Sequence, residues 1–155
     1  MHVVSTRENE ITIRPATLLD VSAVTKLAYA LWNDSDLQEL HQEMRSIIPA
    51  NDAIIYLAFH GEDLVGFAQF QLRVDYVEGT SSSPVGYLEG VYVEPAFRHK
   101  GIARRLVEWG EAWSKDQGCR EFVSDCELKN TASIAFHAAI GFTEANRLVC
   151  FTKSL

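Results

Sequence analysis

The sequence predicts a single domain of the mixed α/β class, and three observations carry this prediction. Segments in which apolar residues alternate are interleaved with segments in which they recur at helical spacing, along nearly the whole chain. The chain has 155 residues, of which 47% are hydrophobic, which is enough for one core without disulfides or metals. One strand-like segment enters a glycine turn, a helix and a further strand, so part of the sheet should be parallel. We therefore expect residues 1–155 to form one domain around a mixed sheet.

The first half of the chain predicts a strand, two helices and a hairpin. Apolar and polar residues alternate from Glu10 to Arg14, and helical spacing follows from Leu18 to Leu31 after the capping residues Thr17 and Asp20. A polar break at residues 33–36 precedes a second amphipathic helix. That helix is expected from Leu37 to Ile48. Two strands, Ala53 to His60 and Leu64 to Tyr76, follow as a hairpin joined at Gly61-Glu62-Asp63.

The second half predicts strands that alternate with helices. A polar loop at residues 79–84 separates it from the hairpin. The expected order for the whole chain is β-α-α-β-β-β-α-β-α-β. The elements of this half are strands at Val85 to Val93, Arg120 to Cys126 and Arg147 to Thr152, helices at Ile102 to Lys115 and Thr131 to Ile140, and an optional strand at Phe142 to Glu144.

The turn between the Val85 to Val93 strand and the next helix predicts an anion site. A helix that begins after a glycine turn offers free backbone N–H groups at its positive end. Arg98, Lys100, Arg104 and Arg105 add cations there, in a chain whose net charge is -7, so the expected anion is a polyphosphate. The turn holds one glycine and no Gly-Lys-Ser/Thr, so it is neither a Walker loop nor a dinucleotide fingerprint.

Two carboxylates lie where ionised groups are poorly tolerated. Glu89 sits inside an apolar strand, and Asp125 closes the strand that begins at Arg120. Each either pairs with a cation or backbone donor of the protein, or faces a cleft and attracts a cationic ligand. The sequence leaves both alternatives open.

Composition narrows the class of partner and compartment. The acidic charge argues against nucleic acid and suits a cationic substrate, although it also serves solubility. Cys119, Cys126 and Cys150 are an odd number without metal-ligand spacing, so we expect buried thiols, a reducing compartment and no metal. The N-terminus carries no long apolar stretch and the run from Ala53 to Phe59 is too short to cross a bilayer. A cytoplasmic protein without membrane contact is expected.

Two motifs resemble the GCN5-related N-acetyltransferases. The family's pyrophosphate loop, Arg/Gln-x-x-Gly-x-Gly/Ala, is matched by Arg98, Gly101 and Ala103, and the stretch from Asn130 to Phe142 is similar to its later Asn-helix-Gly-Phe signature. The resemblance covers nearly the whole chain. It implies the family's fold, in which the fourth and fifth strands splay apart and hold acetyl-CoA in the gap.

The same resemblance implies the residues that contact acetyl-CoA. The strand backbone binds the pantetheine arm, the N–H groups of the loop bind the pyrophosphate, and the later motif contacts the far side of the arm. The residues are Val91, Tyr92 and Val93 on the strand, Arg98, His99, Lys100, Gly101, Ile102, Ala103 and Arg104 on the loop and helix, and Asn130 and Ser133 on the later motif.

For the chemistry, the resemblance implies a catalytic group of Glu89, Asp125, His137 and the backbone of Val91. The Val91 N–H would polarise the thioester carbonyl. The family's usual general acid is a tyrosine, and its position holds His137 here, so this residue is either the acid or a packed core histidine. The two carboxylates would bind the amine and receive its proton.

A more specific likeness concerns the acceptor half. The stretch from Arg73 to Pro95, the segment Leu31-Trp32-Asn33-Asp34 and the pair Ser124-Asp125 are similar to the aminoglycoside 6′-N-acetyltransferases. This likeness implies that Trp32, Tyr76, Glu89 and Asp125 contact a polycationic aminosugar, and that the protein is a homodimer. The alternatives are an acetyltransferase for another amine, such as a polyamine, a small metabolite or a protein N-terminus, and a non-catalytic module that binds acetyl-CoA.

Overall fold

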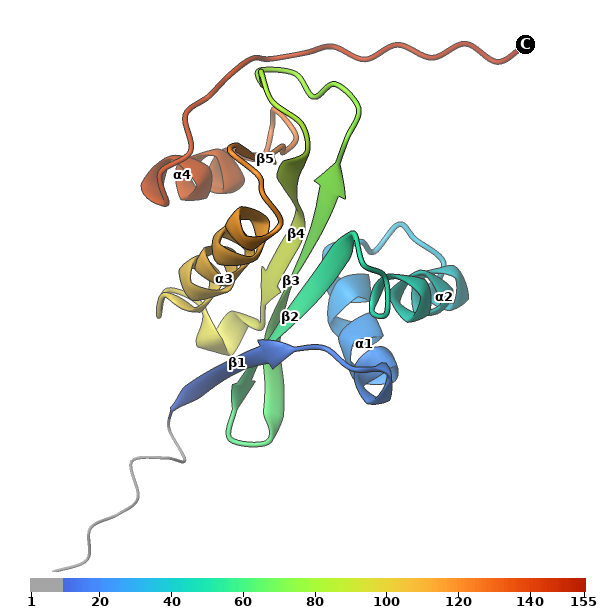
Figure 1. The fold of residues 1–155 in the computed structure, drawn as a ribbon. Helices are drawn as coiled ribbons and strands as arrows, with labels where there is room; N and C mark the ends of the chain where they lie inside the picture. Colours follow the sequence, from blue (N-terminus) through green and yellow to red (C-terminus); the bar gives the residue numbers. More distant parts are fainter. Residues whose placement is uncertain (1–9) are drawn as a thin grey trace, which may run out of the picture.

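A five-stranded mixed sheet forms the centre of the molecule in a computed structural model that describes residues 10–155 (Figure 1). The N-terminal stretch considered above, up to residue 9, lies outside the described residues. Strands β1 to β4 pair antiparallel, and β4 pairs parallel with β5, which confirms the predicted mixed sheet. In spatial order the strands are β1 (Ile11–Pro15), β2 (Ala53–His60), β3 (Asp63–Arg73), β4 (Val85–Val93) and β5 (Phe122–Ser124).

Helices cover both faces of this sheet (Figure 1). On one face lie α1 (Val21–Leu31) and α2 (Leu37–Ile47), and on the other lie α3 (Ile102–Asp116) and α4 (Thr131–Ala139). Short 3-10 helices, η1 (Leu18–Asp20) and η2 (Pro95–Phe97), precede α1 and the cationic turn. The predicted break between the first two helices is confirmed, because Asp36 caps α2 by accepting hydrogen bonds from the N–H groups of Gln38 and Glu39.

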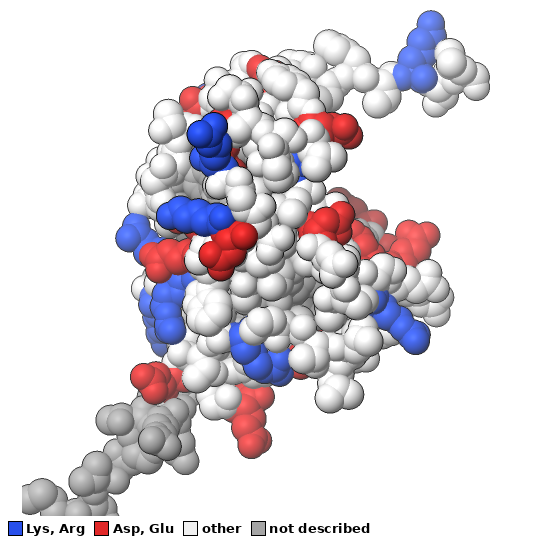
Figure 2. Space-filling view, viewed as in Figure 1, with Lys and Arg blue, Asp and Glu red and all other residues white. Residues whose placement is uncertain are grey.

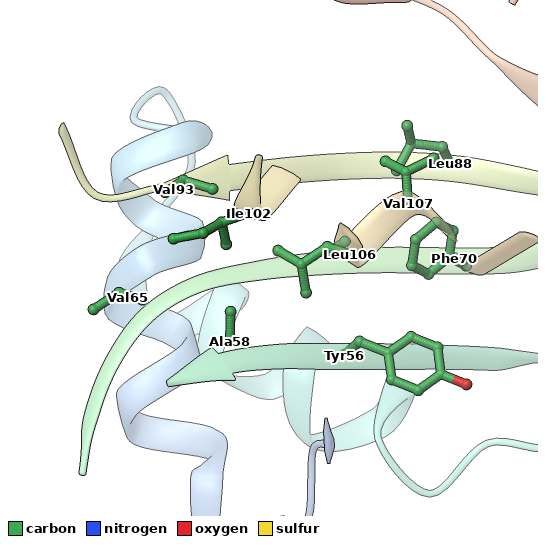
Figure 3. Packing of buried hydrophobic residues seen from close by; sticks show 10 residues of the cluster. Tyr56, Ala58, Val65, Phe70, Leu88, Val93, Ile102, Leu106 and Val107 are labelled. Atoms are coloured by element: carbon green, nitrogen blue, oxygen red, sulfur yellow. The ribbon is translucent and has the colours of Figure 1, made fainter. Parts of the chain in front are cut away.

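The core has two halves, one on each face of the sheet. Between the sheet and α3, the side chains of Phe70, Leu88 and Leu106 are among those that interdigitate (Figure 3). On the opposite face Phe67 packs against Val24 of α1 and Met44 of α2, and all three are fully buried. Because successive strand residues point to opposite faces, the odd-numbered side chains of β3 from Phe67 onward lie on the α1/α2 face.

The sheet forks between β4 and β5. These strands pair over only three residues each, and the last pair joins Leu88 to Ser124. Strand β4 then continues to Val93 with β3 as its partner and nothing paired on its other edge among the described residues. The predicted separation of the fourth and fifth strands is therefore confirmed.

A β-bulge lies at the point of the fork. Gln69 pairs with Gly90 and Phe70 pairs with Leu88, so Glu89 is the extra residue on β4. Leu88 packs on the α3 face, whereas Glu89 and Gly90 both turn to the α1/α2 face, where Glu89 bonds Arg73 of β3 and Gly90 lies against Trp32. Two consecutive positions of β4 therefore face α1 and α2 at the fork, and the Glu89 carboxylate lies on that face beside Arg73.

The predicted final strands, Arg147 to Thr152 and Phe142 to Glu144, are wrong for the single chain. Residues after Gly141 have no regular structure, and the chain runs away from α4 and the sheet (Figure 1). Leu148, Val149 and Phe151 are 65%, 77% and 88% exposed. The apolar pattern was typical of a strand, but a strand also needs a partner edge, and this segment meets none among residues 10–155.

Two smaller expectations also change. The strand predicted from Arg120 to Cys126 is shortened to Phe122–Ser124 because its ends turn into loops. Cys119 is buried as expected, whereas Cys126 and Cys150 are exposed because they lie in the loop after β5 and in the C-terminal segment. No helix within residues 10–155 combines the length and apolar character needed to cross a membrane.

Candidate functional site

The turn before α3 presents backbone N–H groups as an anion cradle. His99 has a φ of 62° and Gly101 a φ of 81°, and alternation of this kind gathers successive N–H groups on one side of a chain. The first backbone hydrogen bond of α3 runs from Arg105 to the carbonyl of Gly101. The amides of Ile102, Ala103 and Arg104 therefore have no acceptor within the helix. Such a turn suits a phosphate group.

Gly101 is required for a reason that its sequence position did not reveal. The structure places Gly101 in the left-handed region, with nothing within 4 Å of where a Cβ would lie. A side chain there would be strained by the backbone conformation itself.

The cations of the turn have structural as well as electrostatic roles. Arg98 Nε donates to the carbonyl oxygen of Val93 at 2.8 Å, which ties the turn to the end of β4. Arg104 donates to the carbonyl of Ala139 at 2.7 Å and holds the end of α4. The Lys100 ammonium lies over the Phe97 ring, 5.5 Å from its centroid. The predicted cationic residues thus surround the cradle and also fix its shape.

The free edge of β4 offers backbone groups from alternate residues. Glu94 N–H bonds the carbonyl of Val65 on β3, so by the alternation of an antiparallel ladder Tyr92 also turns its backbone groups toward β3. Val91 and Val93 then turn theirs toward the fork. Of the three strand residues predicted to contact an extended ligand, two face the gap with their backbone groups.

Glu89 and Asp125 are linked through two side chains that sequence reasoning did not assign. Arg73 donates to Glu89 from Nε at 3.1 Å and from Nη2 at 2.9 Å to each carboxylate oxygen. The same guanidinium carbon lies 3.5 Å from the centroid of the Tyr87 ring. Tyr87, 5% exposed, donates its hydroxyl hydrogen bond to Asp125. The alternative of a protein cation partner is thus correct for Glu89, whereas Asp125 is bonded by a neutral phenol.

The environment of Tyr87 keeps its hydroxyl protonated. Burial, followed by the hydrogen bond to the Asp125 carboxylate, raises the pKa of the Tyr87 phenol well above its usual range. Tyr87 therefore remains a donor to Asp125 at neutral pH.

Trp32 and Tyr76 occupy different settings. Trp32 is half-buried at the end of α1, with its ring edge-on to Phe67 at 5.9 Å between centroids. It fills the space above Gly90, where any Cβ would lie 2.4 Å from the indole. Tyr76 is 77% exposed on the loop after β3, and its hydroxyl bonds Glu78. Trp32 is thus a fixed wall beside Glu89, and Tyr76 stands free in solvent.

Acidic side chains gather at the α1/α2 end of this face. Figure 2 shows a group of them on the side of α2, whereas basic side chains lie mainly on the side of α3 and α4. Asp34, Asp36 and Glu39 are all exposed at the α1–α2 junction. The sheet face between them carries one further free acceptor, because Gln69 Oε1 is buried without a hydrogen-bond partner among residues 10–155. This side of the fork suits a cationic, hydroxyl-rich ligand.

His137 is joined to β5 through Ser124. Its Nδ1 lies 2.7 Å from the carbonyl oxygen of Ser133, and its Nε2 lies 2.7 Å from Ser124 Oγ. Since a carbonyl only accepts, a neutral imidazole here carries its proton on Nδ1 and accepts from the Ser124 hydroxyl at Nε2. The ring also packs 5.2 Å from Phe142. His137 is therefore both packed, as one interpretation held, and hydrogen-bonded to Ser124, the last residue of β5.

Asn130 starts the helix that carries His137. Its side-chain oxygen accepts from the Ser133 N–H at 3.0 Å, which caps α4 and leaves its amide NH₂ group for other contacts. No group of three or more His, Cys, Asp or Glu side chains in the described part of the chain is arranged to hold a metal ion.

Sequence reasoning missed Arg73, Tyr87 and the side chain of Ser124 as members of the site. For Arg73 and Tyr87 strand alternation was an available signal. Arg73 is six residues from Phe67 on β3 and Tyr87 is two residues from Glu89 on β4, so each lies on the same face as that residue. The bulge itself left no signal, because the apolar run of β4 reads as a regular strand.

Comparison with known proteins identifies several close matches. Residues 21–142 match the acetyltransferase (GNAT) family. The aminoglycoside N(6′)-acetyltransferase type 1 of Stenotrophomonas maltophilia is 43% identical over 146 residues, which cover 93% of this chain and 94% of that protein. The protein of the same name from Acinetobacter haemolyticus is 38% identical over 92% of this chain and 98% of its own length.

Solved structures show the same likeness. The crystal structure of aminoglycoside antibiotic 6′-N-acetyltransferase AAC(6′)-IG from Acinetobacter haemolyticus has a TM-score of 0.88 and 35% identity, covering 93% of this chain and 99% of that one. AAC(6′)-Iy in complex with the bisubstrate analogue CoA-S-monomethyl-acetylneamine has a TM-score of 0.91 and 32% identity, covering 95% and 100%.

The bonding of His137 predicts its tautomer. In ¹⁵N-resolved NMR spectra of the histidine side chains at alkaline pH, His137 should carry its proton on Nδ1 because the Ser133 carbonyl accepts it. Ser124→Ala should leave that tautomer in place and shift the Nε2 resonance, since Nε2 loses its donor. The resonances of His41, which is half-buried on α2, should not change. A dominant Nε2–H form in the unmodified protein would contradict the assignment.

Proposed function

The chain belongs to the acetyltransferase (GNAT) family, and we propose that its forked sheet transfers acetyl from acetyl-CoA to the 6′-amine of aminoglycoside antibiotics in a ternary complex. Acetylation of aminoglycosides at this position, with the resistance that it confers, is the function supported by the relatives and structural neighbours. The observation that carries the proposal is the fork itself, which has an open backbone edge and an anion cradle on one side and two carboxylates on the other.

The cofactor half of the site fits acetyl-CoA, which supplies the acetyl group as a thioester. We assign the pyrophosphate to the N–H groups from His99 to Arg104, with Arg98 and Lys100 as flanking cations. The cradle supports this assignment because its amides lack helical acceptors. Val91 and Val93 would bond the pantetheine arm through their backbone, with Tyr92 packing behind them, and Asn130 and Ser133 would line the opposite side.

The acceptor half suits an aminosugar. We assign Glu89 and Asp125 to its ammonium groups, Trp32 to the face of a sugar ring, and Tyr76 to a more distant part of the molecule. Carboxylates bind amines, and aromatic faces pack on sugar rings and cations. The exposed acids at the α1–α2 junction extend the same negative field.

Proton movement assigns the remaining roles. An alkyl ammonium with a pKa near ~10 is neutral in roughly one molecule in a thousand at pH 7, so the site must take a proton before or during attack. We assign this step to Asp125, and its hydrogen bond from a neutral hydroxyl rather than from a cation supports that assignment. The Val91 N–H would polarise the thioester carbonyl. His137 would act as the acid through Ser124 only in its imidazolium form, in which Nε2–H donates to Ser124 Oγ and frees the Ser124 hydroxyl hydrogen for the leaving thiolate.

We further propose a cytoplasmic, single-domain homodimer. Within the described residues one edge of β5 has no partner strand and the apolar segment Arg147 to Thr152 is exposed, which supports a dimer, because a second copy would supply the partner edge for this segment. The thioester cosubstrate and the exposed thiols of Cys126 and Cys150 suit a reducing compartment.

The acceptor is tested with antibiotics that differ only at the 6′ position. Release of free CoA should be fast with a 6′-amine and absent with a 6′-hydroxyl, and spermidine should be a poor substrate. Asp125→Asn should lower kcat/KM for the drug by roughly 10²-fold, the scale of general-base loss, while acetyl-CoA binding measured by calorimetry stays within about twofold. Activity on spermidine alone, or equal losses in both measurements, would exclude the assignment.

The dimer is tested on the C-terminal segment. The double change Val149→Asp and Phe151→Asp places charges on one face of that segment and should convert the dimer to a monomer in analytical ultracentrifugation, because the charges would have to be buried at the interface. Lys153→Glu, directly after this segment, should leave the dimer intact, because that position is already charged. A monomeric unmodified protein, or a double variant that remains a dimer, would refute the proposal.

A further inference from the structure

Arg73 is the member of the acceptor face to which the family resemblance gives no role. It is the last residue of β3, and its side chain is 41% exposed while that of Glu89 is 20% exposed. Its guanidinium has three hydrogen bonds to Glu89, and its carbon lies over the Tyr87 ring, 3.5 Å from the centroid. Paired hydrogen bonds from one planar fork, with an aromatic ring beneath it, hold an arginine more firmly than a single contact would.

These contacts make the two acceptor carboxylates unequal. Glu89 has a full cationic partner, whereas Asp125 has the neutral hydroxyl of Tyr87. Together Arg73, Glu89 and Asp125 carry a net charge of -1, from one positive and two negative groups, where the carboxylates alone would carry -2. An ammonium that enters the site therefore meets roughly half of the negative charge that the carboxylates would otherwise present.

The charge difference matters because the attacking amine must be neutral. A carboxylate beside an ammonium favours its charged form and raises its pKa. Each unit by which that pKa rises removes about nine-tenths of the reactive neutral amine at neutral pH. A site with two uncompensated carboxylates would bind the antibiotic tightly and leave it protonated.

We propose that Arg73 is a positioning residue that lies over Tyr87, holds Glu89 by its hydrogen bonds and compensates the charge of that carboxylate, so that the bound 6′-amine loses its proton near neutral pH. This inference rests on the proposed function of the same site. It assigns the negative field that the amine meets mainly to Asp125. It also explains why a cation lies inside a site for cations, since its partner is the carboxylate and not the substrate.

The other carboxylates on the neighbouring elements all favour the charged form of a bound amine. The loop after β3 contributes Asp75 and Glu78, the α1–α2 junction and α2 contribute Asp34, Asp36 and Glu39, and His137 lies behind Ser124. The acids are exposed, so solvent and salt screen them more than the half-buried pair. Within residues 10–155, Arg73 is the one cation in contact with Glu89.

The test is the pH dependence of single-turnover acetylation with both substrates saturating, which reports the amine in the bound complex. Arg73→Gln leaves Glu89 uncompensated, so the rising limb of the profile should move to higher pH, with a rate roughly tenfold lower at pH 7 and recovery near pH 9. Glu89→Gln leaves Arg73 uncompensated and should move the limb to lower pH. The double variant Arg73→Gln with Glu89→Gln should return the limb close to its original position.

Controls separate this role from support of the fold. Arg14→Gln also removes one positive charge from an ion pair, that of Arg14 with Asp20, and should leave the profile unchanged. Arg73→Lys keeps the positive charge and should keep the pH profile within about half a pH unit. If Arg73→Gln does not fold, Arg73→Lys and Glu89→Gln together still test the proposal. Thermal unfolding of every variant is measured alongside.

The outcomes distinguish this inference from the proposed function. An unmodified protein that does not acetylate a 6′-amine would refute the function itself. An active unmodified protein with unshifted profiles in Arg73→Gln and Glu89→Gln would overturn only the role of Arg73. A shift in Arg73→Gln that the second substitution does not reverse would likewise overturn it, because Arg73 would then act through another group.

Discussion

The end of β4–β5 pairing at Leu88 and Ser124 is the constraint on which the rest of the site depends. Up to that pair the two strands share a ladder, and beyond it β4 has a free edge whose backbone groups need new partners. The bulge at Glu89 lies directly after the last pair. The interruption therefore opens a slot for an extended ligand next to a carboxylate that faces α1 and α2.

The two sides of the fork differ in charge, with positive groups on one side and negative groups on the other. On the side of α3, backbone N–H groups and surrounding cations suit a diphosphate, and they are fixed by Gly101 and by the bond from Arg98 to the end of β4. On the side of α1 and α2, carboxylates and Trp32 suit a cationic sugar. Because the two halves share β4, a shift of that strand would move both ligands together.

The sequence predicted most of the fold, and its misses have physical causes. Alternation and helical spacing located the helices and the first four strands within a few residues, and the loop motif located the anion cradle. The final strand was wrong because apolar alternation indicates a segment that can join a sheet, but does not show whether a neighbouring strand is there to pair with it. The Arg73–Glu89 and Tyr87–Asp125 contacts were missed because alternation within a strand shows which side chains share a face, but not the register between strands that decides which of them meet.

Hydrogen exchange of the β4 amides tests most directly whether the fork is the cofactor slot. In the protein without ligand, the Tyr92 amide should be protected by β3, while the amides of Val91 and Val93 exchange rapidly. Acetyl-CoA should protect Val91 and Val93 and leave Tyr92 unchanged. Protection that appears elsewhere in the chain, with the Val91 and Val93 amides still exchanging rapidly, would contradict a cosubstrate bound at the open edge of β4.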